Sequence, residues 1–371
     1  MGKKKVLLLG GTGAMGDHLT RLLNQDFDVY VTSRRERTCP GVTYIQGNAH
    51  DSEFLKKILN ERHYDVLVDF MIYRTDEFSK RAEFLLSKVD QYVFLSSSRV
   101  YADSEKPIKE DSPRLLDSFK DEEYLQTDEY ALSKARGEDV LRKSGKKNWT
   151  IIRPYITYSE KRLQLGVLEK EGWLFRALNG RTIVFSQDIA DKTTTLTYGY
   201  DVARGIASII GKDEALSQTF HITVDENHTW AEIFNLYIEV LKKNGINPKV
   251  KMTKKIHRIE NPGSKWQVVV DRYYNRQFDN ANIKRFIDTS TFVPTMVGLE
   301  KCLDSFLKNP SFTYIGGEEQ AIFDKITGEM TPLSQLLGWK QKVKYLLYRF
   351  IIPQCLYGFF KTSFFNLKNK V

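Results

Sequence analysis

The sequence predicts a doubly wound α/β fold, in which helices cover both faces of a parallel sheet. Over residues 1–160, short apolar runs alternate with segments whose apolar residues recur at helical spacing. A glycine-rich turn follows the first apolar run directly and opens the first helical segment. After about residue 160 the alternation loosens, which predicts a smaller, less regular region that is mostly C-terminal.

The individual elements follow from apolar patterning and from start and stop signals. The segments expected to form buried strands are 5–10, 28–33, 42–47, 64–71, 91–98, 149–154 and 218–223. The segments expected to form helices are 14–25, 51–62, 75–89, 128–144, 167–180, 200–211 and 229–245. Asp51 or Ser52 is the expected cap of the second helix, and Gly245 is the expected stop signal of the last. The stretch from Lys249 to Gly298 mixes short strands and helices.

Composition favours a globular cytoplasmic protein, with 41% hydrophobic and 28% charged residues. The three cysteines, Cys39, Cys302 and Cys355, are far apart, so they predict neither a disulfide framework nor a metal site. The apolar run near the N-terminus is too short for a signal peptide.

The positive charge is concentrated at the C-terminal end. Residues 340–371 hold seven Lys or Arg and no acid, so subtracting these seven from the net charge of +9 leaves +2. A nearly neutral body has no basic stripe for nucleic acid, and we expect no nucleic-acid partner.

The glycine turn predicts a dinucleotide site and hence a Rossmann-type sheet. Gly10, Gly13 and Gly16 permit a tight turn, close approach of backbone N–H groups to a pyrophosphate, and close helix packing. The other turn residues expected to contact the cofactor are Thr12, Ala14 and Met15. The alternative is an ordinary glycine-rich turn between a strand and a helix.

The end of the second predicted strand indicates which nicotinamide cofactor binds. Ser33 lies twenty residues after Gly13, where a carboxylate would bind the ribose of NAD. Ser33, Arg34 and Arg35 would instead donate to a 2′-phosphate, which predicts NADP(H), with NAD(H) as the alternative. Both arginines could also be solvated loop charges. Asn48 and Ala49 follow the third strand, where an adenine-contacting loop is expected.

The segment "YALSK" predicts the chemical site. It places Tyr130 and Lys134 one helical turn apart, so the ammonium can favour the phenolate of a tyrosine that moves a proton. A serine at the end of "FLSSS" could bind the same substrate oxygen. Taken alone, a tyrosine and a lysine at this spacing are common on exposed helices.

With these motifs in this order, the chain resembles the extended short-chain dehydrogenases/reductases of the NAD-dependent epimerase/dehydratase family. The resemblance covers about residues 4–225 and extends more loosely to about 310. It implies Ser97 (with Ser98 as the alternative), Tyr130 and Lys134 as catalytic residues, and Lys134 also as a ligand of the nicotinamide ribose. Further matches to the family are Arg153 and Pro154 in "IIRPYITYS" and Asp201 in "YGYDVARGI". The resemblance also implies that Tyr130 and Pro154 contact the cofactor.

Departures from the family pattern lie on the substrate side. The usual asparagine, glycine and diphosphate-binding arginine are replaced by Ile156, Ser159 and Thr194. The cations that could take over the role of that arginine are Arg176, Arg181 and Lys192.

These observations predict three regions. Residues 1–160, with contributions from about 196–225, form the NADP(H)-binding core, residues 161–338 the substrate-binding region, and 339–371 a basic aromatic tail. The expected activity is NADP(H)-dependent oxidation, reduction or epimerisation at a carbonyl/alcohol carbon, most readily of a sugar or nucleotide sugar. The pair Ser98-Arg99 replaces the acids that a dehydratase needs. The alternative is a non-enzymatic NADP-sensing or RNA-binding protein on the same fold. A small-molecule substrate is the expected partner, and a homodimer remains open.

The C-terminal tail, Lys342 to Lys370, combines aromatic and basic residues. Its apolar stretch, Tyr345 to Phe360, has 16 residues and is interrupted by Arg349, Pro353 and Gly358, which is too short to span a bilayer. Its composition suits the interface of an anionic membrane, which would place the enzyme at the inner face of that membrane. A terminal helix that docks on protein is the alternative.

Overall fold

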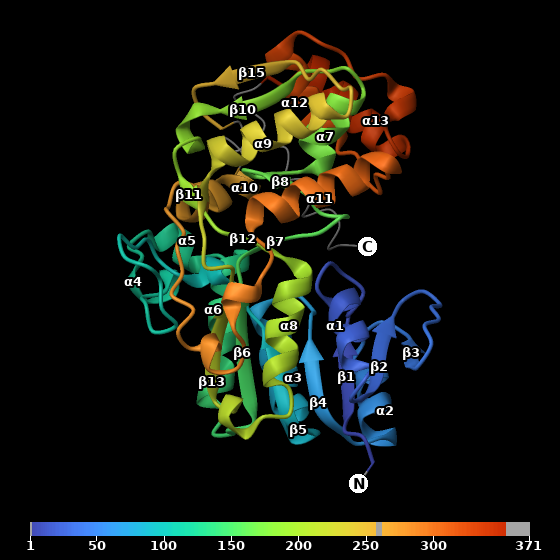
Figure 1. Cartoon of the computed structure of the whole chain (residues 1–371), viewed down its shortest axis with the longest axis vertical. Helices are drawn as coiled ribbons and strands as arrows, with labels where there is room; N and C mark the ends of the chain where they lie inside the picture. The colour runs from blue at the N-terminus through green and yellow to red at the C-terminus, as the bar shows by residue number, and fades with distance from the viewer. Residues whose placement is uncertain (1, 257–261, 354–371) are drawn as a thin grey trace. The chain divides into compact units, whose positions relative to one another are not determined.

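The chain forms two compact units, whose elements are coloured along the sequence in Figure 1. The computed structural model describes residues 2–256 and 262–353. The first unit, here called the sheet unit, comprises residues 2–159, 195–227 and 276–295. The second, here called the accessory unit, comprises residues 160–194, 228–256, 262–275 and 296–353.

The sheet unit is built on seven parallel strands. They are β1 (Lys5–Leu9), β2 (Asp28–Ser33), β3 (Val42–Gln46), β4 (Tyr64–Asp69), β5 (Val89–Leu95), β6 (Trp149–Pro154) and β13 (Gln218–Ile222). Their spatial order is β13-β6-β5-β4-β1-β2-β3, and every neighbouring pair is parallel. The order reverses direction at β1, which confirms the predicted doubly wound sheet.

Alternation of side chains along β1 divides the core into two layers. Val6 and Leu8 pack with α1 (Gly16–Leu23) and α8 (Gly199–Ile209), whereas Leu7 and Leu9 belong to the cluster on the other face. The helices of that other cluster are α2 (Ser52–Glu61), α3 (Thr75–Ser87) and α6 (Tyr130–Lys143). The five inner strands β2, β1, β4, β5 and β6 contribute apolar side chains to both clusters, so their two faces are both covered.

Shorter elements complete the sheet unit. They are η1 (Ser98–Val100), α4 (Leu115–Ser118), α5 (Glu122–Gln126), β7 (Ile156–Tyr158), β12 (Leu196–Tyr198), η3 (Asp213–Ala215), η6 (Ile283–Arg285) and η7 (Thr289–Thr291). Of the two residues predicted to cap α2, Asp51 is the one whose side chain accepts hydrogen bonds, from the N–H groups of Glu53 and Phe54.

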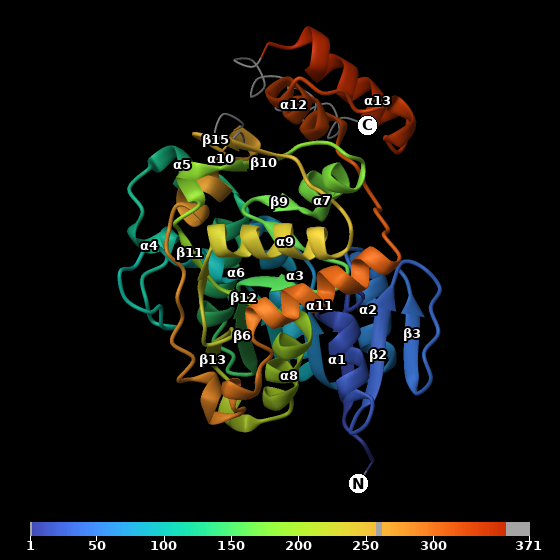
Figure 2. The ribbon, with the colours of Figure 1, turned by 45° about the horizontal axis from the view of Figure 1, so that its top comes forward.

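The accessory unit combines short strand pairs with longer helices. Its first elements are β8 (Gln164–Leu165), β9 (Leu168–Glu169), α7 (Lys170–Leu178), β10 (Ile183–Ser186), η2 (Gln187–Ile189), β11 (Thr193–Thr194), β14 (His228–Thr229) and α9 (Trp230–Lys243). The later ones are β15 (Val250–Thr253), α10 (Pro262–Gln267), η5 (Val268–Arg272), α11 (Thr295–Lys308), α12 (Gly317–Thr327), η8 (Leu333–Gln335), α13 (Trp339–Leu346) and η9 (Leu347–Ile351). Figure 2 shows α12 and α13 side by side.

Helix α9 organises the core of the accessory unit. Its Tyr237 stacks on Trp173 of α7, with ring centroids 4.6 Å apart, and its Phe234 stacks on Phe185 of β10 at 4.7 Å. A capping box at Thr229 begins the helix, and Gly245, with a φ of 77°, follows its end as the sequence predicts.

The sequence and the structure differ mainly beyond residue 160. Near the start of the predicted helix 167–180, Leu168 and Glu169 form β9 instead. The helix itself begins at Lys170. The regular helices α11 and α12 were not predicted. No helix in the described ranges has the length and apolarity needed to cross a membrane. Residues 354–370 of the predicted tail lie outside the described residues.

Candidate active site

The glycine turn between β1 and α1 has an open backbone surface. Gly10 has a φ of 69°, which side-chain-bearing residues rarely adopt. A Cβ on Gly16 would lie 2.5 Å from the backbone of Gly11, so α1 needs glycine to pack this closely. A Cβ on Gly13 would meet no atom within 4 Å. The turn thus leaves room beside the N-terminus of α1, where the pyrophosphate of a dinucleotide fits.

The other turn residues support this shape. The N–H of Thr12 donates to Gly10 O at 2.8 Å, which closes the turn. Met15 packs against the hydrophobic cluster beneath α1. Gly199 of α8 lies so close to Ala14 that a Cβ there would be 2.7 Å from the Ala14 carbonyl oxygen. The turn is therefore held from both sides.

The end of β2 places two guanidinium groups in solvent. Arg34 and Arg35 are both exposed, and neither forms an ion pair within the described ranges. Ser33 is buried, and its hydroxyl donates to Arg35 O at 2.7 Å and accepts from Arg35 N at 3.2 Å. The serine therefore shapes the turn, while the two arginines remain available to an anion.

The loop after β3 is ordered by a side chain that the sequence reasoning missed. Asn48 Oδ1 accepts from His50 N at 3.2 Å, and Ala49 is buried. The guanidinium of Arg81, on α3, donates to the carbonyls of Ala49 and His50. Arg81 also stacks over the ring of Tyr73, 4.5 Å from its centroid. Only the pairing in space reveals this arginine, because nothing in its local sequence marks it.

A buried acid lies at the end of β4 and binds two phenols. Tyr92 OH donates to Asp69 Oδ2 at 2.7 Å, and Tyr73 OH donates to the same oxygen at 3.0 Å. The Met71 N–H donates to Asp69 Oδ1 at 2.9 Å. Burial raises the pKa of the Asp69 carboxyl, although these hydrogen bonds oppose the shift. Asp69 is not among the site residues predicted from the sequence.

The ammonium of Lys134 is buried against backbone carbonyls. Its Nζ donates to Leu95 O at 2.6 Å, at the end of β5, and to Met71 O at 3.3 Å, after the end of β4. Lys134 is 3% exposed. Burial lowers its pKa to about 8, although the negative charges of Asp69 and Glu138 oppose that shift. The lysine predicted from the sequence therefore has an environment that brings its titration close to neutral pH.

Tyr130 is the first residue of α6 and lies between two cations. Lys134 Nζ is 6.0 Å from the centre of its ring, and the guanidinium carbon of Arg99 is 5.4 Å from it. Arg99 forms an ion pair with Glu129 at 2.7 Å, and both side chains are mostly buried. Glu129 is the cap of α6, since it accepts from Ala131 N at 2.7 Å. From the sequence, Arg99 is predicted only as the replacement for an acid, and Glu129 is not predicted as a site residue.

The structure distinguishes the two candidate serines after β5. Ser98 is fully buried, and its hydroxyl donates to Arg153 O at 2.7 Å. Ser97 Oγ accepts from Arg99 N at 3.2 Å, and its own hydroxyl proton is given to no acceptor among the described residues. Ser97 can therefore still donate to a substrate, whereas Ser98 already uses its proton.

These groups share one edge of the sheet. The glycine turn, the arginines, Asp69 and Ser97 all follow the carboxyl ends of parallel strands, and Pro154 is the last residue of β6. In open α/β sheets ligands bind at this edge. The structure thus brings the predicted residues of the sheet unit to the same side, with Tyr130 and Lys134 beside the end of β5.

The cations considered as replacements for the diphosphate-binding arginine belong to the accessory unit. Arg176 is fully buried and forms ion pairs with Asp324 and Glu329, both at 2.8 Å. Arg181 is 6% exposed and donates to Gln335 at 2.7 Å. Arg176 is therefore fully engaged, whereas Nε and Nη2 of Arg181 are buried without a hydrogen-bond partner among the described residues. Lys192, the third of these cations, is half-buried.

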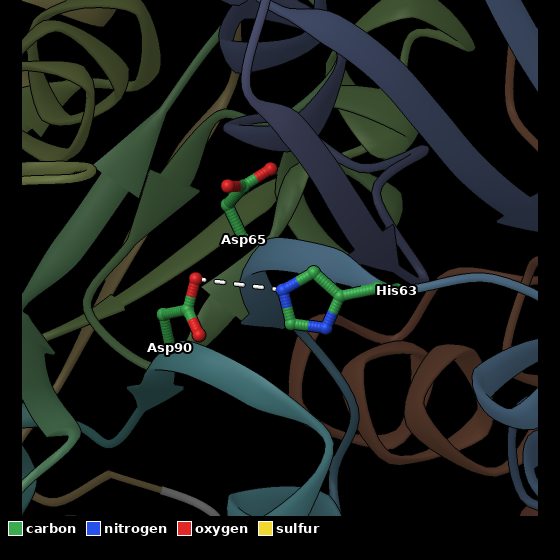
Figure 3. Close-up of side chains that lie close together, drawn as sticks. All are labelled: His63, Asp65 and Asp90. Carbon is green, nitrogen blue, oxygen red and sulfur yellow. Dashed lines mark ion pairs between the residues drawn. The ribbon is translucent and has the colours of Figure 1, made fainter.

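A histidine and two acids lie close together at the opposite edge of the sheet (Figure 3). His63 Nε2 pairs with Asp90 Oδ2 at 3.4 Å, and Asp65 Oδ2 accepts from Lys5 N at 2.7 Å. His63 and Asp90 are exposed. Because these contacts account for the cluster, and a metal site needs more than adjacent acids, we assign no metal to it.

The chain matches a known protein family over most of its length. The family model, described as the RmlD substrate binding domain, matches residues 4–262. A search of curated protein sequences found no match.

Several solved structures share the fold. An epimerase from Methanothermobacter thermautotrophicus is 18% identical, with a TM-score of 0.65 over 83% of this chain and 93% of that one. The dTDP-glucose 4,6-dehydratase of Bacillus anthracis, in complex with NAD, is 16% identical, with a TM-score of 0.62 over 82% and 97%. The UDP-glucuronic acid 4-epimerase of Bacillus cereus, in complex with UDP-glucuronic acid and NAD, is 17% identical, with a TM-score of 0.62 over 82% and 99%.

Identities this low show the fold alone, but the family model covers most of the chain. In this chain the glycine turn follows β1, the serines follow β5, and the Tyr-x-x-x-Lys segment begins α6, which agrees with that match. The chain therefore belongs to the RmlD substrate-binding-domain family, among the extended short-chain dehydrogenases/reductases.

Proposed function

We propose that the protein is an NADP(H)-dependent oxidoreductase or epimerase that acts on a carbonyl/alcohol carbon of a sugar or nucleotide sugar. The observation that carries this proposal is the Tyr130–Lys134 pair beside the end of β5, at the same sheet edge as an open glycine turn. Lys134 is buried and close to its titration point, as expected of a functional rather than a structural cation.

The proposed reaction combines two transfers, a hydride transfer to or from the cofactor and a proton transfer to or from Tyr130. A bound nicotinamide cofactor supplies the site that gives or takes the hydride at the substrate carbon. Tyr130 gives its phenolic proton to the substrate oxygen during reduction and takes it back during oxidation. Lys134 favours the phenolate by its positive charge, and Ser97 donates a hydrogen bond to the same oxygen. The glycine turn would hold the pyrophosphate, and the loop at Asn48 and Ala49 the adenine.

Arg99 acts as a positioning residue in this proposal. Its guanidinium lies over the ring of Tyr130 and is fixed by the ion pair with Glu129. A cation there stabilises the phenolate, so the phenolate form that accepts a proton should be available at lower pH. In Arg99→Met, the rise of turnover with pH in the direction of substrate oxidation should shift to higher pH. Arg99→Lys should restore the wild-type profile in part. An unchanged profile in Arg99→Met would contradict the role.

NADP(H) is the proposed cofactor because Arg34 and Arg35 are exposed beside the turn and have no acidic partner among the described residues. No carboxylate lies at the end of β2 to repel a 2′-phosphate. NAD(H) is the alternative, and the dehydratase and the UDP-glucuronic acid epimerase named above are both complexes with NAD. Direct titration with both cofactors decides between them.

A nucleotide sugar is the proposed substrate class. The support is the family itself and the likeness to an epimerase structure that holds UDP-glucuronic acid. Arg176 is engaged in ion pairs inside the accessory unit, which leaves Arg181 and Lys192 as the proposed donors to the diphosphate. We also propose a cytoplasmic enzyme that contacts the inner face of the membrane through its C-terminal residues. A homodimer stays a prediction, for which light scattering is the measurement.

The direct test is a panel of nucleotide sugars and simple ketones, followed by NADPH absorbance and by product analysis. Turnover with cofactor retained through purification would indicate an epimerase, and turnover that consumes free NADPH a reductase. Cofactor binding without turnover of any member would support the non-enzymatic alternative and contradict the proposal.

A further inference from the structure

Exposed apolar side chains are concentrated near the end of the described chain. Of the fourteen large hydrophobic side chains that are exposed in residues 2–256 and 262–353, eight lie between residues 330 and 351. Five of them follow one another on the last helical segment and are here called the α13 face: Trp339, Val343, Leu346, Phe350 and Ile351. Trp339 is 70% exposed and Ile351 68%. Exposed apolar side chains gathered on one short segment in this way mark an interaction site.

The opposite side of the same segment is fixed to the accessory unit. Tyr345, Tyr348 and Ile352 are buried in a cluster with residues of α12. The Tyr345 hydroxyl donates to Asp324 at 2.8 Å and accepts from Thr331 N at 3.0 Å. Since these buried residues lie on one side of the helix, α13 packs on α12 and the α13 face points outward.

Cations border the apolar stripe on both sides. At about 100° per residue, Lys340 and Lys344 fall on one flank of the line from Trp339 to Leu346 along α13, and Lys342 falls on the other. Lys340 and Lys344 are exposed, and the sequence from 330 to 353 contains no acid. A protein partner would need an apolar groove with acids on both rims. A bilayer of anionic lipids presents both features over any large area.

We infer that the α13 face binds the interface of an anionic phospholipid bilayer, with α13 lying in the membrane plane. This inference names the surface for the membrane contact proposed above and does not depend on the redox chemistry. Trp339 and Phe350 are placed at headgroup depth, and the three lysines bind lipid phosphates. The 13 residues of α13 and η9 extend only about 20 Å, which is too short to cross a bilayer.

The test is sedimentation of the full chain with vesicles. Two sets are used, one of phosphatidylcholine alone and one containing phosphatidylglycerol, at low and at high salt. Wild-type protein should bind the anionic vesicles at least about tenfold more tightly than the neutral ones, and high salt should weaken this binding. Equal binding to both sets would overturn the inference.

Variants assign the binding to the surface. Trp339→Ala/Phe350→Ala and Lys340→Gln/Lys344→Gln should each lower affinity for anionic vesicles at least about tenfold. The matched control is Val250→Ala/Met252→Ala, which removes exposed apolar side chains of β15 and should bind as wild type. Circular dichroism confirms folding of each variant.

Two results would reject the α13 face as a membrane surface. Wild-type binding by both α13 variants would place the contact elsewhere, including residues 354–371. A dimer that dissociates on Trp339→Ala/Phe350→Ala, without vesicle binding by wild type, would assign the face to a second copy of the chain. Cofactor affinity measured in solution should be unchanged in all variants, so failure of this inference is separable from failure of the proposed enzyme.

Discussion

Helix α6 carries two buried charged side chains one turn apart, Lys134 and Glu138, and they differ in their partners. The ammonium has carbonyl oxygens as hydrogen-bond acceptors, whereas the carboxylate has oppositely charged partners. Lys134 binds two backbone carbonyls, and burial lowers its pKa to about 8. Glu138 has no exposed surface, but Arg153 Nη2 lies 2.6 Å from it, and Arg114 and Arg142 lie within 3.3 Å. Burial alone would raise the pKa of Glu138, yet these guanidiniums, Arg153 foremost, lower it.

The difference separates a structural charge from a functional one. A carboxylate with three guanidinium partners has a lowered pKa and belongs to an ion-pair network that holds elements together. An ammonium with carbonyl partners alone is close to losing its proton and responds to whatever binds nearby. Under the proposed function, the N-terminal turn of α6 would perform the chemistry. The following turn fixes the helix to β6 through the ion pair of Glu138 with Arg153.

The largest expected effect is on stability at Glu138. Glu138→Ala would leave Arg153 buried without its carboxylate and should lower the free energy of unfolding by about 3–5 kcal/mol. Lys134→Met, its matched control on the same helix, removes a charge that burial disfavours and should leave stability unchanged or higher. Urea titrations of both variants measure this contrast. A larger loss in Lys134→Met than in Glu138→Ala would break the comparison.

The second effect is on chemistry at Tyr130. Tyr130→Phe removes the transferable proton and keeps the ring, so turnover should fall at least about a hundredfold while cofactor binding survives. The assay uses the substrate identified by the panel, with cofactor affinity measured separately by titration. Near-normal turnover in Tyr130→Phe would show that this tyrosine is not the acid/base.

A smaller effect is expected at the cofactor end of the sheet. NADPH should bind about tenfold more tightly than NADH, equivalent to about 1.4 kcal/mol, because Arg34 and Arg35 can bind the 2′-phosphate. Arg34→Ala/Arg35→Ala should remove the difference and leave NADH affinity unchanged. Equal affinities of the wild-type protein for both cofactors would refute the preference, and Arg37→Ala is the control because Arg37 pairs with Asp17.

The smallest effect is a pH dependence of stability from Lys134. Its folded pKa of about 8 is below the ordinary lysine value, so between these two values the unfolded chain binds more protons. Stability should therefore rise with pH, and the contribution of Lys134 between pH 7 and pH 9 should be about 1 kcal/mol. The difference between wild type and Lys134→Met, measured by urea titration at both pH values, isolates this group. A difference that does not change with pH would mean that the lysine is not desolvated.

The fold could be predicted because its signals are local. Each strand of the sheet unit is a short apolar run, and the glycine turn sits next to the strand that it ends. The chemical residues were named from their spacing on one helix and from the family resemblance. What those signals could not give was their environment, since the carbonyls that bind Lys134 belong to Leu95 and Met71, which are 39 and 63 residues away.

The same limit explains the residues that were missed. Asp69 is an unremarkable acid at the end of "YDVLVD" until Tyr92, 23 residues later, is found to donate to it. Glu129 could have been noticed as the residue before Tyr130, but its partner Arg99 lies 30 residues away. In the accessory unit, α12 has helical apolar spacing, but its packing partners include Phe175 of α7, which is distant in the sequence.

The contact between α12 and α13 depends on one position that has no side chain. A Cβ on Gly317 would lie 2.0 Å from the carbonyl oxygen of Gln341, so even one methyl group would act as a wedge between the two helices. No rotamer can relieve that overlap, because both partners are backbone or bound directly to it. A related chain with any other residue at this position must hold its last helix elsewhere. A glycine at the position of Gly317 in a related sequence therefore indicates that its last helix can pack on α12 as it does here.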